Sequence, residues 1–192
     1  MSLPRLAAFG LALTALVAAP APASAATSTF ERLEVIAASD FRVTETCDDG
    51  RTVTSRVRIT GGHEEEAEDG VTTLDRDYTR VQIQSGCTGI IQVTTNELDF
   101  VWTESLQTAS VAGTFTTAAG DTISLDVAWD GTGPIAISQN NTSFPGRSST
   151  FVGKERDATA TGTVSLNGKT LVDGSTTNAS IETLHDRTVE TV

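Results

Sequence analysis

The feature that most constrains the fold is an alternation of apolar and polar side chains with a period of two residues. In the clearest segment, 122–130, every second residue is large and apolar: Ile123, Leu125, Val127 and Trp129. Because successive side chains of a β-strand point to opposite faces of a sheet, this pattern predicts a strand with one buried face and one hydrated face. Segments 51–60 and 158–166 alternate in the same way, so we expect an antiparallel sheet.

The turns between these segments indicate an all-β domain. Asn167-Gly168 is typical of a type I′ hairpin turn, which needs positive φ at both central residues, and Gly120-Asp121 predicts a second hairpin. No segment after residue 25 has the period of an amphipathic helix. Since most of the expected strands connect to the next strand along the chain, we predict an antiparallel β-barrel of the up-and-down type and of lipocalin-like size, with a β-sandwich as the alternative.

The other strand candidates are shorter and less regular. They lie at 33–36, 41–46, 78–84, 89–95, 98–103, 110–117, 135–138, 149–153, 170–172 and 179–185. Two segments interrupt the alternation and are predicted to be mobile surface loops, the acidic segment 61–77 and the polar segment 139–147. Elsewhere the small residues Ala158, Ala160 and Gly162 indicate a crowded interior or a sharply coiled strand.

Residues 1–25 have the pattern of a secretory signal peptide. Arg5 precedes a short apolar stretch at 6–17, and residues 23–25 have the small side chains of a cleavage site. The apolar stretch is shorter than the roughly 20 residues that span a bilayer, so no membrane insertion is expected. We therefore predict a protein that is secreted to the extracellular space, with a single all-β domain at 26–192.

The charge of the chain limits the classes of partner. With 13 Lys and Arg against 25 Asp and Glu, the formal net charge is −12. Such acidity disfavours nucleic acid, whose binding requires cationic side chains on phosphates, and it disfavours anionic membrane surfaces. We expect no nucleic-acid partner, and we expect a monomer or a weak oligomer. The Thr-rich, Gly-rich and Lys-poor composition is typical of exported bacterial proteins.

The two cysteines, Cys47 and Cys87, predict one disulfide bond. Export places them in an oxidising compartment, where pairing of two cysteines is the normal outcome. The bond would close a loop of about 40 residues, which corresponds to roughly 4 kcal/mol in the chain-entropy model.

Residues for catalysis or for a metal centre do not form a recognisable motif. The sequence contains no G-x-S-x-G motif, and His63 and His185 are the two candidate imidazole bases. His63 falls in the predicted acidic loop, but consecutive Glu side chains on an extended segment point apart, and their spacing does not match a calcium-binding loop. We therefore expect no metal and no cofactor, and we favour a role without enzymatic activity.

Three aromatic residues are the candidate ligand-binding side chains: Tyr78, Trp102 and Trp129. Aromatic side chains dominate small-molecule pockets, and a barrel of about eight strands can hold one small ligand. The alternative is that both tryptophans are ordinary core residues, since Trp129 continues the apolar face of its strand.

The expected function is non-catalytic binding of a small molecule or an extracellular partner by a secreted domain. This hypothesis predicts an apolar pocket near Trp102 or Trp129. One alternative is a barrel enzyme of hydrolase or isomerase type with interior acid–base residues, which predicts buried carboxylates, or His185 in a cleft, with a perturbed pKa. Another alternative is a structural component of the cell surface, which predicts a flat, exposed edge strand.

Overall fold

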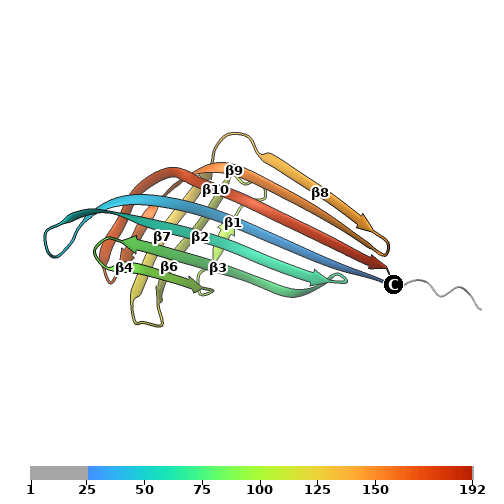
Figure 1. The fold of residues 1–192 in the computed structure, drawn as a ribbon, viewed down its shortest axis with the longest axis horizontal. Helices are drawn as coiled ribbons and strands as arrows, with labels where there is room; N and C mark the ends of the chain where they lie inside the picture. The colour runs from blue at the N-terminus through green and yellow to red at the C-terminus, as the bar shows by residue number, and fades with distance from the viewer. Residues whose placement is uncertain (1–25, 192) are drawn as a thin grey trace, which may run out of the picture.

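The computed structural model describes residues 26–191, and it confirms the all-β class (Figure 1). The described chain consists of ten antiparallel strands: β1 (Thr27–Thr46), β2 (Thr52–Glu68), β3 (Val71–Ser85), β4 (Gly89–Thr95), β5 (Phe100–Trp102), β6 (Thr108–Thr116), β7 (Thr122–Gly131), β8 (Ala136–Phe144), β9 (Arg147–Leu166) and β10 (Lys169–Thr191). Within it there is no helix that is long and apolar enough to cross a membrane. The predicted signal peptide at 1–25 lies outside the described residues.

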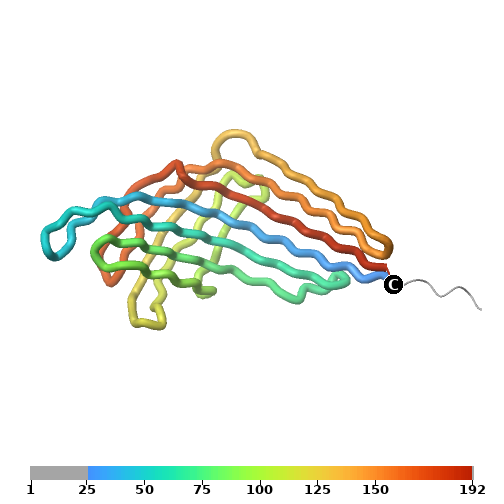
Figure 2. Tube along the Cα trace, viewed as in Figure 1, coloured from blue at the N-terminus to red at the C-terminus, as the bar shows by residue number. Residues whose placement is uncertain are grey.

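All ten strands belong to one sheet, in which neighbours along the chain are mostly neighbours in space. The hydrogen-bonded order is β4-β3-β2-β1-β10-β9-β7-β6-β5, and β8 pairs with the first half of β9. The first and last strands also pair, from Thr27 opposite Thr191 to Ser39 opposite Ala179. Because β4 and β5 are the two ends of this path in the described chain, the sheet is rolled but not closed (Figure 2).

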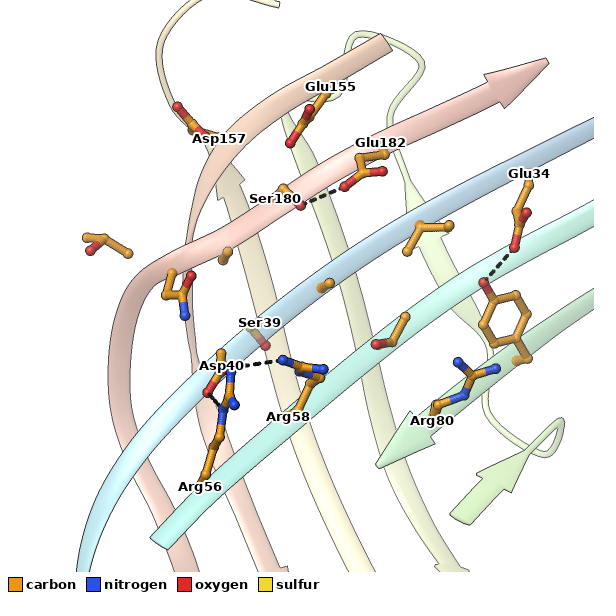
Figure 3. A pocket seen from close by; sticks show the side chains of 17 residues that line it. Glu34, Ser39, Asp40, Arg56, Arg58, Arg80, Glu155, Asp157, Ser180 and Glu182 are labelled. Atoms are coloured by element: carbon orange, nitrogen blue, oxygen red, sulfur yellow. Dashed lines mark hydrogen bonds and ion pairs between the residues drawn. The ribbon is translucent and has the colours of Figure 1, made fainter. Parts of the chain in front are cut away.

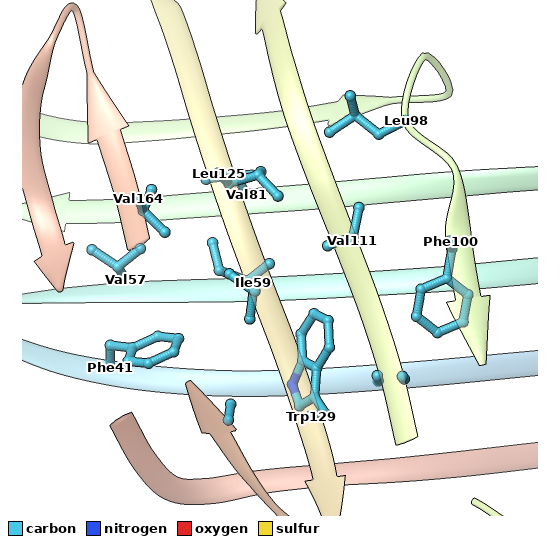
Figure 4. Close-up of a cluster of buried hydrophobic side chains, with 14 of the residues drawn as sticks. Phe41, Val57, Ile59, Val81, Leu98, Phe100, Val111, Leu125, Trp129 and Val164 are labelled. Carbon is cyan, nitrogen blue, oxygen red and sulfur yellow. The ribbon is translucent and has the colours of Figure 1, made fainter. Parts of the chain in front are cut away.

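One part of the rolled sheet, which we call the body, folds back on itself. It consists of β4, β5, β6 and β7 with residues 35–46 of β1, 52–61 of β2, 79–85 of β3, 156–166 of β9 and 169–181 of β10. Figure 4 shows β6 and β7 crossing β1–β4 steeply, with apolar side chains between the two layers. Trp129, Ile59 and Val57 are completely buried there. Burial of these apolar faces is the main stabilising contribution in the body.

The strands β9 and β10 turn sharply in the body. Gly162 lies so close to β7 that a Cβ atom would come 2.2 Å from the carbonyl oxygen of Asp126. In β10 the pairing with β9 shifts register at 170–172 and at 176–179, and such bulges bend a strand. The crowding predicted for this part of β9 is therefore confirmed.

The other part of the sheet, which we call the blade, is a single layer (Figures 1 and 2). It consists of six neighbouring segments: 136–144 of β8, 147–155 of β9, 182–191 of β10, 27–34 of β1, 62–68 of β2 and 71–78 of β3. Among the described residues, none of the buried hydrophobic core side chains comes from the blade. Away from its junction with the body, the blade therefore has solvent on both faces.

Both predicted loops are strands of the blade, so these two predictions were wrong. Segment 61–77 is a hairpin of β2 and β3, with its turn at Asp69 and Gly70, which both have positive φ. Segment 139–147 contains most of β8 and the turn into β9. The acidic run misled the prediction because its charge was counted without regard to face. Successive glutamates point to opposite faces, and Glu64 pairs with arginines on both neighbouring strands.

Several predicted strands are pieces of longer ones. The candidates at 33–36 and 41–46 both belong to β1, and those at 149–153 and 158–166 both belong to β9. The hairpin turn at Asn167-Gly168 is confirmed, with positive φ at both residues. The alternation therefore located the strands but not their full lengths.

The predicted disulfide between Cys47 and Cys87 is confirmed, and it joins the end of β1 to the turn between β3 and β4. Beside it, the carboxylate of Glu45 accepts hydrogen bonds from the hydroxyls of Ser55 and Ser85. These bonds, that from Ser55 above all, hold the pKa of Glu45 below its usual range. An ionised, hydrogen-bonded carboxylate therefore ties β1 to β2 and β3 at this end of the body.

Candidate functional site

A groove of about 680 Å³, which we call the outer groove, lies on the face of the sheet opposite the core, where the body meets the blade (Figure 3). Five strands contribute to it: β3, β2, β1, β10 and β9. The alternation of β1 explains which side chains reach this face. Val35 and Ala37 point into the core, whereas Ile36 and Ala38 point into the groove.

One wall of the outer groove is basic. Arg56 and Arg58 extend from β2, and Arg80 extends from β3. Arg56 forms a bidentate pair with the buried carboxylate of Asp40, and Arg58 lies 3.4 Å from the same carboxylate. Arg80 is exposed and takes part in none of the ion pairs of the described residues. The wall therefore keeps positive charge that faces the groove.

Asp40 holds this wall in position. Its carboxylate is 7% exposed, and the hydrogen bonds from Arg56, which outweigh the effect of burial, lower its pKa. It therefore stays ionised at neutral pH. Because a single negative charge is shared between Arg56 and Arg58, the cluster of three side chains remains net positive.

The opposite wall is acidic. Glu182 extends from β10, and Glu155 and Asp157 extend from β9 (Figure 3). Glu182 accepts a hydrogen bond from the hydroxyl of Ser180 at 3.1 Å. Within residues 26–191, none of these three carboxylates forms an ion pair with Lys or Arg. Their negative charge therefore also faces the groove.

The pairing register gives the separation of the two walls. One row of the sheet crosses the groove and consists of Arg80, Thr60, Ala38, Ser180 and Asp157. Neighbouring strands are about 4.8 Å apart, so the backbones at the ends of this row are about 19 Å apart, and β2 and β10 are about 10 Å apart. The middle of the row has small side chains, which leaves a trough between walls of opposite charge.

Tyr78, one of the predicted ligand-binding residues, lies at the blade end of the outer groove. Its ring covers Gly62, where a Cβ atom would come 2.4 Å from the ring, and its hydroxyl donates a hydrogen bond to Glu34 at 3.0 Å. Burial and then the negative charge of Glu34 raise the pKa of Tyr78. The phenol is therefore a neutral hydrogen-bond donor that is fixed in place.

A charged network lies next to Tyr78 on the outer face of the blade. Glu64 is 9% exposed, and it pairs with Arg32 at 2.5 Å and with Arg76 at 2.7 Å. The hydrogen bonds from Arg76 are the main cause that lowers the pKa of Glu64. Since these three residues lie on β1, β2 and β3, the network joins strands that have no hydrophobic core beneath them.

A second groove, of about 400 Å³, opens on the inner face of the sheet at the junction of body and blade. Trp102, another predicted ligand-binding residue, lines it, and Leu33, Val35 and Val152 add apolar surface. His185 of β10 also lines this groove and is exposed. An open groove therefore lies beside Trp102, and the charged side chains of Glu104 and Lys154 line it together with the apolar ones.

His63 packs against Trp102, with ring centroids 4.6 Å apart. Its Nδ1 lies 2.8 Å from Asp77 Oδ1, and the other carboxylate oxygen of Asp77 accepts a hydrogen bond from the backbone N–H of Phe100 at 2.9 Å. These contacts join β2, β3 and β5. His63 is therefore a fixed part of the junction, in contrast to the mobile loop in which the sequence placed it.

Trp129, the third predicted ligand-binding residue, is completely buried in the core of the body (Figure 4). The structure therefore does not bring the three aromatic residues together, because one lies in the core and the other two line different grooves. The two charged walls of the outer groove were not predicted. The spacing of Arg56 and Arg58 placed both on one face of their strand, but no local pattern linked them to Glu182 far along the chain.

Among residues 26–191, no group of three or more His, Cys, Asp or Glu side chains is placed to hold a metal ion. Comparison of the chain with protein-family models, with curated proteins and with solved structures finds no match. The function is therefore inferred from the geometry and charge of the grooves themselves.

Proposed function

We propose that this chain is a secreted, non-catalytic binding protein and that the outer groove is its binding site. The observation that carries the proposal is the opposed charge of the two walls, with Arg58 and Arg80 on one side and Asp157 and Glu182 on the other. Walls that do not neutralise each other favour a ligand with both an anionic and a cationic group. The disulfide and the signal-like segment at 1–25 support an extracellular setting.

The separation of the walls favours a short, extended peptide over a free amino acid. The two charges of an amino acid lie within one residue, roughly 3.5 Å, whereas the walls are about 10 to 19 Å apart. An extended peptide advances about 3.3 Å per residue, so an acidic and a basic side chain about three to six positions apart would reach both walls. The small side chains of Ala38 and Thr60 leave space between the walls for the peptide backbone.

The buried carboxylates support binding over the enzyme alternative. A carboxylic acid that donates a proton at neutral pH needs a raised pKa, which burial without a cationic partner provides. Asp40, Glu45 and Glu64 are shielded from solvent, but each accepts hydrogen bonds that lower its pKa. These three carboxylates therefore stay ionised and hydrogen-bonded to their donors. Such groups hold strands and neighbouring side chains in position, and they have no proton to donate at neutral pH.

Isothermal titration calorimetry with capped hexapeptides tests the proposal. The probe has Asp at its first position and Lys at its sixth, and its blocked ends leave only the side-chain charges. We expect weak binding, with a dissociation constant on the order of 1 mM or higher, because exposed ion pairs contribute only about 0.2–1 kcal/mol each. Probes with Asp alone or Lys alone should bind more weakly, and an absence of heat with all three probes would contradict the proposal.

Variants of the two walls test whether the probe binds in the outer groove or is attracted by the overall charge of the protein. R80Q and E182Q should each weaken binding of the Asp/Lys probe about two- to fivefold, as expected for the loss of one ion pair. R187Q is the matched control, because Arg187 lies on the inner face of the blade and pairs with Glu31 at 2.9 Å. If R187Q weakens binding as much as R80Q, the outer groove is not the site.

A further inference from the structure

The strand β8 forms a free edge of the blade. Among the described strands it pairs only with β9, and it lies at the margin of the molecule (Figure 1). All nine of its residues are exposed. The N–H and C=O groups along its free side can therefore pair with another strand.

This edge lacks the features that usually prevent such pairing. Proteins protect their sheet edges with charged side chains, prolines, bulges or very short strands. Residues 132–146 contain no charged side chain, although the chain has a net charge of −12, and Pro134 and Pro145 flank β8 without lying in it. Ile137 and Phe144 are 68% and 65% exposed, so pairing at this edge would also cover apolar surface.

The other edges are protected or shorter. The opposite edge of the blade, at 71–78 of β3, carries Asp75, Arg76 and Asp77. At the two ends of the rolled sheet, β5 has three residues and β4 has seven, against nine in β8. In the described sheet, β8 is therefore the longest edge without a charged side chain.

We propose that β8 pairs with β8 of a second copy of this chain, antiparallel, about a two-fold axis at Asn140. In that register the strand is complementary to itself, with Ala136 opposite Phe144, Ile137 opposite Ser143, Ser138 opposite Thr142 and Gln139 opposite Asn141. The phenyl ring of Phe144 then covers a small side chain, and polar side chains meet on both faces, where they can hydrogen-bond across the two strands. A two-fold contact of this kind closes as a dimer.

Local charge and shape favour a second copy as the occupant of this edge. The adjacent segment of β9 carries Arg147, Lys154 and Glu155, so the two acidic molecules meet where neither is acidic. Each β8 begins at its own body and ends at the tip of its own blade. Antiparallel pairing therefore places the two bodies at opposite ends of a continuous layer of twelve strand segments. The outer groove is not lined by β8, so dimerisation and peptide binding can fail independently.

Sedimentation equilibrium of the secreted protein tests the proposal. We expect a reversible dimer whose fraction rises with concentration in the micromolar to millimolar range. N140K places two ammonium groups opposite each other at the axis, and it should weaken dimerisation about two- to fivefold. Q92K is the matched control, because it adds the same charge to the same face of the sheet on the edge strand β4, and it should leave dimerisation unchanged.

If N140K disturbs folding, a cross-linking variant tests the β8–β8 pairing instead. Residues that face each other in an antiparallel pair have Cα atoms about 4.5–5.5 Å apart, which a disulfide can bridge. N140C should therefore form a disulfide-linked dimer under mild oxidation, and Q92C should not. A wild-type protein that is monomeric at millimolar concentration, or cross-linking of Q92C in preference to N140C, would overturn the proposal.

Discussion

The same five strands, β1, β2, β3, β9 and β10, run through both the body and the blade, but only in the body do they bury a face. There, the strands β6 and β7 cover them, and residues such as Trp129 are completely buried. In the blade, charged side chains occupy both faces, with Glu64 on the outer face and Glu31 on the inner face. The ladder of backbone hydrogen bonds therefore continues beyond the core, but the side chains that support it change from apolar to charged.

The two regions differ in what determines the strand register. In the body, a slip of one residue would turn apolar side chains such as Ile59 and Val57 out to solvent, so the register is strongly specified. A layer that is polar on both faces lacks this constraint. In the blade, cross-strand pairs such as Arg32–Glu64 and Glu31–Arg187 take over that role. Pairs of this kind contribute about 0–1 kcal/mol each and are weakened by salt.

The largest effect should come from W129A in the body. Loss of a completely buried Trp costs about 3–5 kcal/mol of unfolding free energy, which urea unfolding followed by circular dichroism measures. W102A is the matched control at the junction, and it should cost clearly less because Trp102 is partly exposed. Equal losses would mean that the junction is packed as tightly as the body, which would remove the distinction between the two regions.

A smaller loss of unfolding free energy, about 1–3 kcal/mol, should follow G162A, which lies where β9 bends in the body. The added Cβ atom would lie 2.2 Å from the carbonyl oxygen of Asp126, so β7 and β9 would have to move apart. G153A makes the same change in the blade, where the new Cβ atom would meet the hydroxyl of Ser138, which can rotate away. The urea midpoint should therefore fall more for G162A than for G153A. The reverse order would show that the crowding of β9 in the body does not limit stability.

The smallest effect on stability should come from the ion pairs of Glu64 in the blade, and it should appear when the pH is lowered. The pKa of Glu64 is lowered from its usual 4.5, so its contribution is fully present above pH 4.5 and is lost as the pH falls through the lowered value. Hydrogen exchange at 62–68 and 71–78, corrected for the intrinsic rate, should show less protection below pH 4.5. E64Q should cost about 1 kcal/mol or less at neutral pH and should remove much of this pH dependence. An unchanged pH profile in E64Q would assign the dependence to other carboxylates.

The body could be predicted from the sequence because one of its faces is buried. The segments predicted at 122–130 and 158–166 coincide closely with β7 and with the second half of β9. In the blade the contrast between apolar and polar positions disappears, because both faces are hydrated. The segments 61–77 and 139–147 therefore had the composition of loops although their backbones are paired on neighbouring strands.

The candidate site was harder to predict, because its two walls come from distant parts of the chain. Arg56 and Arg58 could be placed on one hydrated face from their spacing alone. Arg80 and Asp157, however, share a row only because β1 pairs with β10, and no local signal specifies that the first and last strands meet. The aromatic residues were chosen for their chemistry, and chemistry alone could not separate the buried Trp129 from the accessible Trp102.

The pairing of Thr27 with Thr191 has a mechanical consequence. Both ends of the described chain lie side by side at the tip of the blade. A force that pulls them apart would therefore break the hydrogen bonds of the β1–β10 ladder one residue pair at a time, in the unzipping geometry. It would not act in shear on the full length of the strands. The Cys47–Cys87 bond lies at the far end of β1, beyond this seam, and cannot share the load until the seam has opened. The molecule should therefore yield easily to traction at its ends, although its body is covalently cross-linked.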